Sequence, residues 1–144
     1  MNNDSKKAAL PFRILYTMLR VADLERSIEF YTNALGMNEL RRENFTEGRF
    51  TLVFIGYGDE ASNAVIELTF NWDKVNYEHG TGFGHIALMV PDIYAVCKRL
   101  EGLGVKIVMQ PGPMVFAVDE TDHKEEIAFI EDPDGYKIEL IQTL

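Results

Sequence analysis

The fold is decided by the stretch Gly82–Val90, GFGHIALMV, in which one histidine, His85, stands in an otherwise apolar run. Two further apolar runs each carry one carboxylate in the same way, since VIELTF contains Glu67 and YKIELI contains Glu139. Polar groups in such strands are costly to bury unless a partner satisfies them. One divalent metal, or the remnant of a site for one, would satisfy all three side chains.

The bulk composition bounds the class of protein. The chain has 144 residues, of which 47% are hydrophobic, and this fits one domain with a real core. Its formal net charge of −9 argues against nucleic-acid and anionic-membrane partners, because both need basic surface. The single cysteine, Cys97, excludes an intrachain disulfide, and no apolar run reaches the length of a signal peptide or a membrane span. We therefore expect a cytoplasmic protein that binds neither nucleic acid nor membrane.

Apolar periodicity predicts the same order of elements twice: a strand, a helix and three strands. The helices are expected to begin at the capping residues Asp23 and Asp92, and glycines, among them Gly36 and Gly104, fit their ends. The buried face of the first helix is predicted at Leu24, Ile28, Tyr31 and Leu35, and that of the second at Ile93, Val96, Leu100 and Leu103. Strands are located at residues 14–21, 50–55 and 65–70 in the first half and at 85–90, 105–109, 127–130 and 136–141 in the second, with a loop at 110–124 and a turn at 132–135. Residues 1–12 are expected to form a loose tail before a single domain at 13–142, with modules at about 13–72 and 83–142 and a linker at about 73–82.

The two halves also match residue by residue, which indicates an internal duplication. When Tyr16 is aligned with His85, Leu19 matches Leu88, Val21 matches Val90 and Asp23 matches Asp92. After a slip of one residue, Leu35-Gly36 matches Leu103-Gly104. Further on, Phe54-Ile55 matches Phe129-Ile130, and Ile66-Glu67-Leu68 matches Ile138-Glu139-Leu140. Side chains two and four residues apart share one face of a strand. If the halves pair about a pseudo-twofold axis, one face therefore gathers Tyr16, Arg20, Glu67, Asn71, His85 and Glu139.

This set of side chains suits metal-assisted chemistry. One imidazole and two carboxylates fit Ni, Co, Fe, Mn or Zn better than Ca or Mg. Such a metal with open positions can hold two oxygens of a substrate while a carboxylate moves a proton between adjacent carbons. Arg20 could hold a substrate carboxylate or form a surface salt bridge, and Asn71 could touch a ligand or serve a turn. The alternative for His85 and both glutamates is that they are ordinary strand residues facing solvent.

Several stretches give the chain a specific resemblance: TMLRVADLERSIEFY at 17–31, LGM at 35–37, FIGYG at 54–58, VIELT at 65–69, NW at 71–72, GHIAL at 84–88 and FIEDPDGYKIEL at 129–140. Over about residues 14–142 the chain resembles glyoxalase I (lactoylglutathione lyase), of the vicinal-oxygen-chelate superfamily, and most closely its short bacterial members. The resemblance implies an α+β fold of two tandem βαβββ modules that form curved mixed sheets around a cavity. It also implies a homodimer in which each active site is built across the subunit interface.

The resemblance further implies isomerisation of the glutathione–methylglyoxal hemithioacetal to S-D-lactoylglutathione through an enediolate, with glutathione as co-substrate. Glu67, His85 and Glu139 match three of the family's four metal ligands, and the short bacterial enzymes prefer Ni²⁺ or Co²⁺ over Zn²⁺. Glu139 also matches the residue given the proton-transfer role. Arg20 and Asn71 match positions that contact glutathione.

Two departures from the family pattern leave alternatives open. The fourth ligand position, a histidine in the family, is Tyr16 here, so the site keeps three protein ligands plus water, binds metal weakly or does not bind it. The loop before Ile127 is long and acidic, with only Lys124 to offset its charge, where the family offers a lysine or a glycine-rich stretch. Its apolar run at residues 114–118 predicts a different, more apolar lid. The competing functions are a non-catalytic small-molecule-binding protein and a different metal-dependent lyase or dioxygenase on the same fold.

Overall fold

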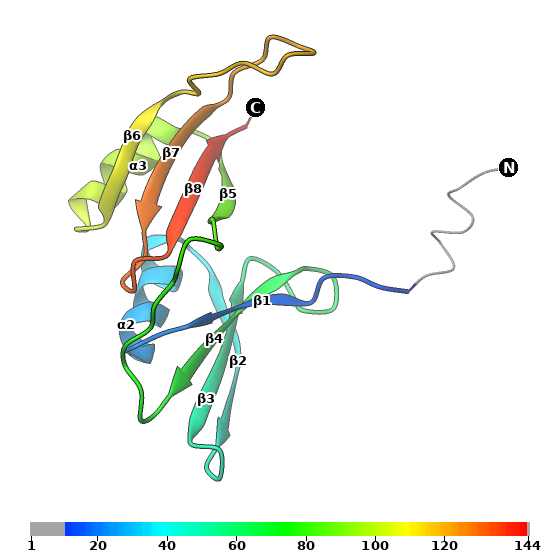
Figure 1. The fold of residues 1–144 in the computed structure, drawn as a ribbon, viewed down its shortest axis with the longest axis vertical. Helices are drawn as coiled ribbons and strands as arrows, with labels where there is room; N and C mark the ends of the chain where they lie inside the picture. Colours follow the sequence, from blue (N-terminus) through cyan, green and yellow to red (C-terminus); the bar gives the residue numbers. More distant parts are fainter. Residues whose placement is uncertain (1–10, 144) are drawn as a thin grey trace, which may run out of the picture.

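A computed structural model describes residues 11–143, so the tail expected at residues 1–12 lies almost wholly outside the described residues. The first four strands and the second four form two separate sheets, one above the other in Figure 1 with α2 at their junction. Module 1 consists of β1 (Tyr16–Arg20), α2 (Leu24–Glu29), the π-helical turn η1 (Phe30–Ala34), β2 (Asn38–Phe45), β3 (Phe50–Gly56) and β4 (Val65–Asn71). Module 2 consists of β5 (Ile86–Val90), α3 (Ile93–Gly102), β6 (Lys106–Pro113), β7 (Glu126–Glu131) and β8 (Lys137–Gln142). The predicted order of a strand, a helix and three strands is confirmed in both modules, although the sequence located only two of the three strands that follow the first helix.

The two sheets have the same topology and the same register. Their strand orders are β1-β4-β3-β2 and β5-β8-β7-β6. β1 runs parallel to β4 and β5 runs parallel to β8, whereas the other neighbouring strands are antiparallel. Met18 faces Glu67 across the parallel pair of module 1, and Ala87 faces Glu139 across that of module 2. The mixed sheets of the expected α+β fold are therefore present, and their pairing confirms the internal repeat.

Local details repeat as well. Asp23 accepts a hydrogen bond from the Arg26 amide at 3.1 Å, and Asp92 accepts one from the Ala95 amide at 3.1 Å, as the predicted caps require. Gly36 and Gly104 have φ angles of 74° and 82°, the left-handed conformation that glycine adopts most easily after a helix.

A β-bulge lies at equivalent places, between Glu39 and Arg41 in β2 and between Ile107 and Met109 in β6. The bulges make Arg41 and Met109 equivalent residues, because Arg41 faces Phe54 on β3 and Met109 faces Phe129 on β7. No apolar pattern in the sequence indicated this correspondence.

The slip of one residue between the repeats has a structural cause. The first helix is predicted as one segment up to Leu35, but it changes after Glu29 into the π-helical turn η1. A π-helical turn inserts one extra residue into a helix, and the Leu35 amide accordingly bonds to the Phe30 carbonyl five residues back, at 3.2 Å. Module 1 thus absorbs its additional residue without moving Gly36 from the helix end.

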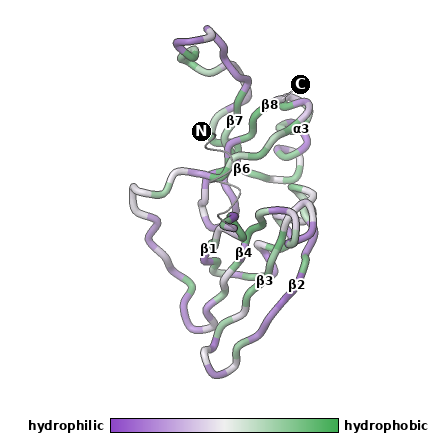
Figure 2. Tube along the Cα trace, turned by 90° about the vertical axis from the view of Figure 1, so that its right-hand side faces the viewer, coloured by the Kyte–Doolittle hydropathy of each residue, from purple (hydrophilic) through white to green (hydrophobic). Residues whose placement is uncertain are grey.

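Other sequence predictions need correction. Residues 110–113 belong to β6, although the sequence predicts a loop there, because bulged pairing with β7 carries the strand past its apolar part. Leu103 is expected on the buried face of α3 but is exposed, since the helix ends before it. No pattern located β2, which is a hydrophilic edge strand with mostly exposed side chains (Figure 2).

One hydrophobic core contains buried residues of both modules. The predicted turn at residues 132–135 of module 2 also forms hydrogen bonds with module 1. The buried Tyr31 hydroxyl of η1 donates to Asp132 Oδ2 at 2.6 Å, while Asp134 accepts from the Ala22 amide at 2.9 Å and from Ser27 Oγ at 3.1 Å. Burial, together with the Asp132 charge, raises the pKa of Tyr31, which keeps this phenol a donor. None of the helices between residues 11 and 143 is both long and apolar enough to cross a bilayer.

Candidate metal centre

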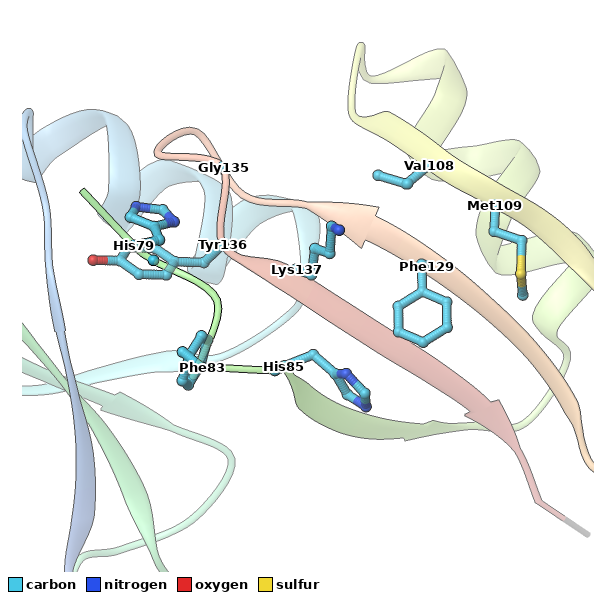
Figure 3. Close-up of a pocket in the computed structure, with 11 residues that line it drawn as sticks. His79, Phe83, His85, Val108, Met109, Phe129, Gly135, Tyr136 and Lys137 are labelled. Atoms are coloured by element: carbon cyan, nitrogen blue, oxygen red, sulfur yellow. The ribbon is translucent and has the colours of Figure 1, made fainter. Parts of the chain in front are cut away.

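His85 and Glu139 meet on the open face of the second sheet. His85 directly precedes β5, and its Nε2 lies 3.1 Å from Glu139 Oε1 on the neighbouring strand β8. The imidazole packs edge-on against Phe129, with ring centroids 5.0 Å apart and an interplanar angle of 84° (Figure 3). A nitrogen and an oxygen donor thus stand side by side, and an aromatic ring fixes the plane of the imidazole.

These two residues border a hollow that we call the His85 hollow. It has a volume of about 640 Å³ and is lined by His79, Gly80, Phe83, Gly84, His85, Val108, Met109, Phe129, Gly135, Tyr136 and Lys137. His79 lies in the predicted linker, and its ring stacks on Tyr136 with centroids 4.1 Å apart. The Tyr136 hydroxyl donates to the Arg20 carbonyl at 2.8 Å, and burial raises the pKa of this phenol. The hollow is therefore aromatic on one side and tied to β1 of module 1.

Strand parity gave a signal for part of this lining. Lys137 stands two residues before Glu139 and shares its face, and Phe129 lies directly opposite Glu139 in the ladder. His79 gave no such signal, because its contact with Tyr136 joins segments that are distant in the sequence.

Tyr16 and Glu67 occupy the equivalent places on the first sheet. Glu67 is only 7% exposed, and its Oε1 accepts a hydrogen bond from Thr69 Oγ1 at 3.0 Å. Tyr16 is 44% exposed and packs edge-on against Phe54, with centroids 5.3 Å apart and an interplanar angle of 77°. Glu67 thus finds its partner along its own strand, whereas Glu139 finds His85 on the neighbouring strand.

The four side chains at ligand positions do not converge within one chain. They form two pairs on different sheets, and residues 11–143 contain no group of three His, Cys, Asp or Glu side chains that could share a metal. The donor types nevertheless suit a divalent transition metal, since they comprise an imidazole nitrogen and carboxylate oxygens. Within one chain, the candidate ligands therefore lie in two separate pairs, one on each sheet.

Arg20 and Asn71 lie on the open face of the first sheet. Strand parity places Arg20 with Tyr16 and Asn71 with Glu67. The Arg20 side chain is exposed and forms no ion pair with another residue of the described part. Asn71 Nδ2 donates to the Tyr77 hydroxyl at 3.0 Å. The guanidinium of Arg20 is thus available to an anionic group that approaches this face.

The loop between β6 and β7 extends beyond the ends of both strands (Figure 1). Val115 and Phe116, from the apolar run predicted as a lid, are 80% and 81% exposed. At the base of the loop the Tyr94 hydroxyl donates to Glu126 at 2.9 Å, and this hydrogen bond raises the pKa of Tyr94. The lid role of the apolar run stays a prediction.

Comparison with known proteins identifies relatives along nearly the whole chain. Residues 13–140 match the Glyoxalase/Bleomycin resistance protein/Dioxygenase superfamily. A probable lactoylglutathione lyase of Synechocystis sp. is 55% identical over 130 residues, covering 90% of this chain and 95% of the relative. The lactoylglutathione lyase of Neisseria meningitidis serogroup A is 52% identical, with 90% of each chain covered.

Solved structures agree. The trypanothione-dependent glyoxalase I of Leishmania major has a TM-score of 0.76 and 43% identity, covering 91% of this chain and 86% of that one. Glyoxalase I of Zea mays has a TM-score of 0.83 and 40% identity over 91% of this chain. This chain spans 44% of the length of the maize protein.

Proposed function

The chain belongs to the Glyoxalase/Bleomycin resistance protein/Dioxygenase superfamily, and from this premise we propose that it is a metal-dependent lactoylglutathione lyase. The reaction is isomerisation of the hemithioacetal of glutathione and methylglyoxal to S-D-lactoylglutathione. The observation that carries the proposal is the 3.1 Å contact between His85 Nε2 and Glu139 Oε1 at the edge of a hollow. Relatives more than 50% identical bear the name of this enzyme, so a non-catalytic binder and a dioxygenase are not favoured.

The metal would be held by Glu67, His85 and Glu139. A divalent ion at these donors would stabilise, as a Lewis acid, the negative charge that develops on substrate oxygens. We favour Ni²⁺ or Co²⁺, with Zn²⁺ as an alternative, because mixed nitrogen and oxygen donors suit all three and the short bacterial enzymes prefer the first two.

Glu139 is the proposed proton carrier. Isomerisation requires that a proton leave the hemithioacetal carbon and return to the adjacent carbon, so one carboxylate can take it and give it back. Glu139 lies beside His85 and opposite Phe129 on the open face of the second sheet, and its side chain is largely buried. The enediolate formed between the two transfers is the species that the site must stabilise.

Arg20 and Asn71 are the proposed contacts to the glutathione part of the conjugate. A guanidinium binds a carboxylate through two parallel hydrogen bonds, and Arg20 is exposed on the face that carries Glu67. Asn71 offers an amide two strand positions further along the same face as Thr69.

We propose that two copies of the chain form a homodimer in which the first sheet of one copy faces the second sheet of the other. This arrangement unites Glu67 of one copy with His85 and Glu139 of its partner. It also covers apolar side chains that a single chain leaves exposed on these faces, such as Met18 and Met89. A location in the cytoplasm suits a substrate built on a thiol and a chain whose one cysteine is buried.

The test is to prepare metal-free protein, add Ni²⁺, Co²⁺ or Zn²⁺, and follow thioester formation from the hemithioacetal. Thioester formation that depends on added metal and is lost in Glu139→Gln supports the proposal. The proposal fails if no metal produces thioester under conditions in which Tyr16→His is active.

A further inference from the structure

Tyr16 stands in module 1 where His85 stands in module 2. The two parallel strand pairs share one register, since Met18 faces Glu67 as Ala87 faces Glu139, and each aromatic residue lies two positions before that contact. The backbone therefore presents the phenol to the first sheet as it presents the imidazole to the second.

The rings also take equivalent places relative to their sheets. Tyr16 meets the edge of Phe54 with centroids 5.3 Å apart, and His85 meets Phe129 with centroids 5.0 Å apart, at interplanar angles of 77° and 84°. Phe54 lies opposite Glu67 and Phe129 lies opposite Glu139. The phenol ring thus lies over its sheet where an imidazole ring would lie.

The two rings differ in reach. An imidazole binds with a nitrogen inside its ring, and the metal stands about 2.1 Å beyond that atom. A phenol carries its oxygen one bond outside the ring, so a phenol in the same ring position brings oxygen within about 1 Å of the place that the metal would take. The Tyr16 oxygen and a metal cannot both occupy that place.

The surroundings limit the movement of the Tyr16 ring toward the sheet. Phe54 is 2% exposed, and the Arg41 guanidinium carbon lies 3.6 Å from its ring centroid while Arg41 Nε donates to Glu60 at 2.8 Å. A backing residue packed in this way leaves the Tyr16 ring little room to withdraw toward the sheet. Glu67 accepts a hydrogen bond from Thr69, and among the described residues the Tyr16 hydroxyl forms no hydrogen bond that would draw it elsewhere.

We propose that Tyr16 supplies no ligand to the metal and instead competes with it for space. The protein ligands are then Glu67, His85 and Glu139, and Tyr16 sets the affinity of the site. The inference rests on the proposed function for the assembly of these residues, but metal binding tests it without any turnover.

The experiment titrates Ni²⁺ into metal-free parent protein, Tyr16→Phe and Tyr16→His by calorimetry, with bound metal per chain measured separately. Tyr16→Phe removes the obstructing oxygen and is expected to bind at least about threefold more tightly, and Tyr16→His adds a ligand and is expected to gain at least about tenfold. Tyr94→Phe, which removes an exposed phenol hydroxyl from α3, is the matched control and should bind like the parent. Thermal unfolding of all variants confirms that each is folded.

Three results would overturn the inference. Weaker binding by Tyr16→Phe would identify the phenol oxygen as a ligand, and equal affinities in all three proteins would place Tyr16 away from the metal. Absence of Ni²⁺ binding in all three proteins would show that these residues form no metal site. If Ni²⁺ affinity rises from the parent to Tyr16→Phe to Tyr16→His but no variant forms thioester, the inference stands and the proposed enzyme function fails. If the parent forms thioester and the order of affinities is reversed, the proposed function stands and the inference fails.

Discussion

The two modules share the same strand order and the position of a β-bulge, yet several side chains on their open faces differ. Tyr16 corresponds to His85, Arg20 to Met89 and Thr69 to Ile141, as the two strand registers show. The strands fix where each side chain points, and the identity of the side chain decides whether it binds metal, anion or neither. The two sheets therefore share strand order and register, and the side chains that differ between them determine what each open face can bind.

The largest expected difference lies between the two glutamates. Glu139→Gln should lower kcat by about 10² to 10⁴, because it removes the proposed proton carrier. Glu67→Gln should mainly weaken metal binding, so that excess metal restores much of its activity. Measurement of kcat and bound metal over a range of Ni²⁺ concentrations checks both, and equal losses of kcat at saturating metal would contradict the distinct role of Glu139.

The next difference lies between Arg20 and its counterpart. Arg20→Gln should raise KM for the glutathione hemithioacetal about tenfold or more, because a hydrogen bond to a charged group contributes about 1.5–3 kcal/mol. Met89→Gln, at the equivalent position of the second sheet, shows what a polar substitution does on a face that the partner would cover, without removing a guanidinium. A similar rise of KM in both variants would remove Arg20 from the proposed thiol-conjugate site.

The junction between the modules allows a test of stability. Tyr31→Phe should lower the free energy of unfolding by about 1–3 kcal/mol, because it deprives buried Asp132 of the hydroxyl that donates at 2.6 Å. Tyr57→Phe removes an exposed hydroxyl that donates to the Leu35 carbonyl and should cost less, about 0.5 kcal/mol. Urea unfolding gives both values, and equal losses would show that the Tyr31–Asp132 contact does not hold the modules together.

The smallest expected difference lies between the two helix caps, whose removal should lower stability by equal amounts. Asp23→Ala and Asp92→Ala should each cost about 1 kcal/mol of stability, since each removes one cap hydrogen bond of 3.1 Å. Thermal or urea unfolding should give values that agree within error. A large inequality would mean that the two modules are not energetically equivalent.

The sequence predicted those features that local patterns encode. Apolar alternation located the inner strands, capping chemistry located Asp23 and Asp92, and proline and glycine located the turn at residues 132–135. Comparison of the halves also paired Tyr16 with His85, which the register confirms.

Features that depend on distant contacts could not be predicted. The edge strand β2 has no buried face along most of its length, so no period of two marks it. The stack of His79 on Tyr136 brings a linker residue against the residue that precedes β8, and no local pattern in the sequence predicts such a contact. For the same reason the sequence left open whether the ligand pairs meet within a chain, and the structure keeps them apart.

The central claim is that one site is built from the first module of one copy and the second module of another. It is tested most directly by mixing two impaired proteins, Arg20→Gln/Glu67→Gln and Glu139→Gln, after joint unfolding and refolding, at a Ni²⁺ concentration too low to restore the Glu67→Gln site. In a mixed dimer one of the two sites contains no altered residue, so we expect recovery of about a quarter of the parent activity. A mixture that forms dimers but shows only the summed residual activity of its components would contradict the claim.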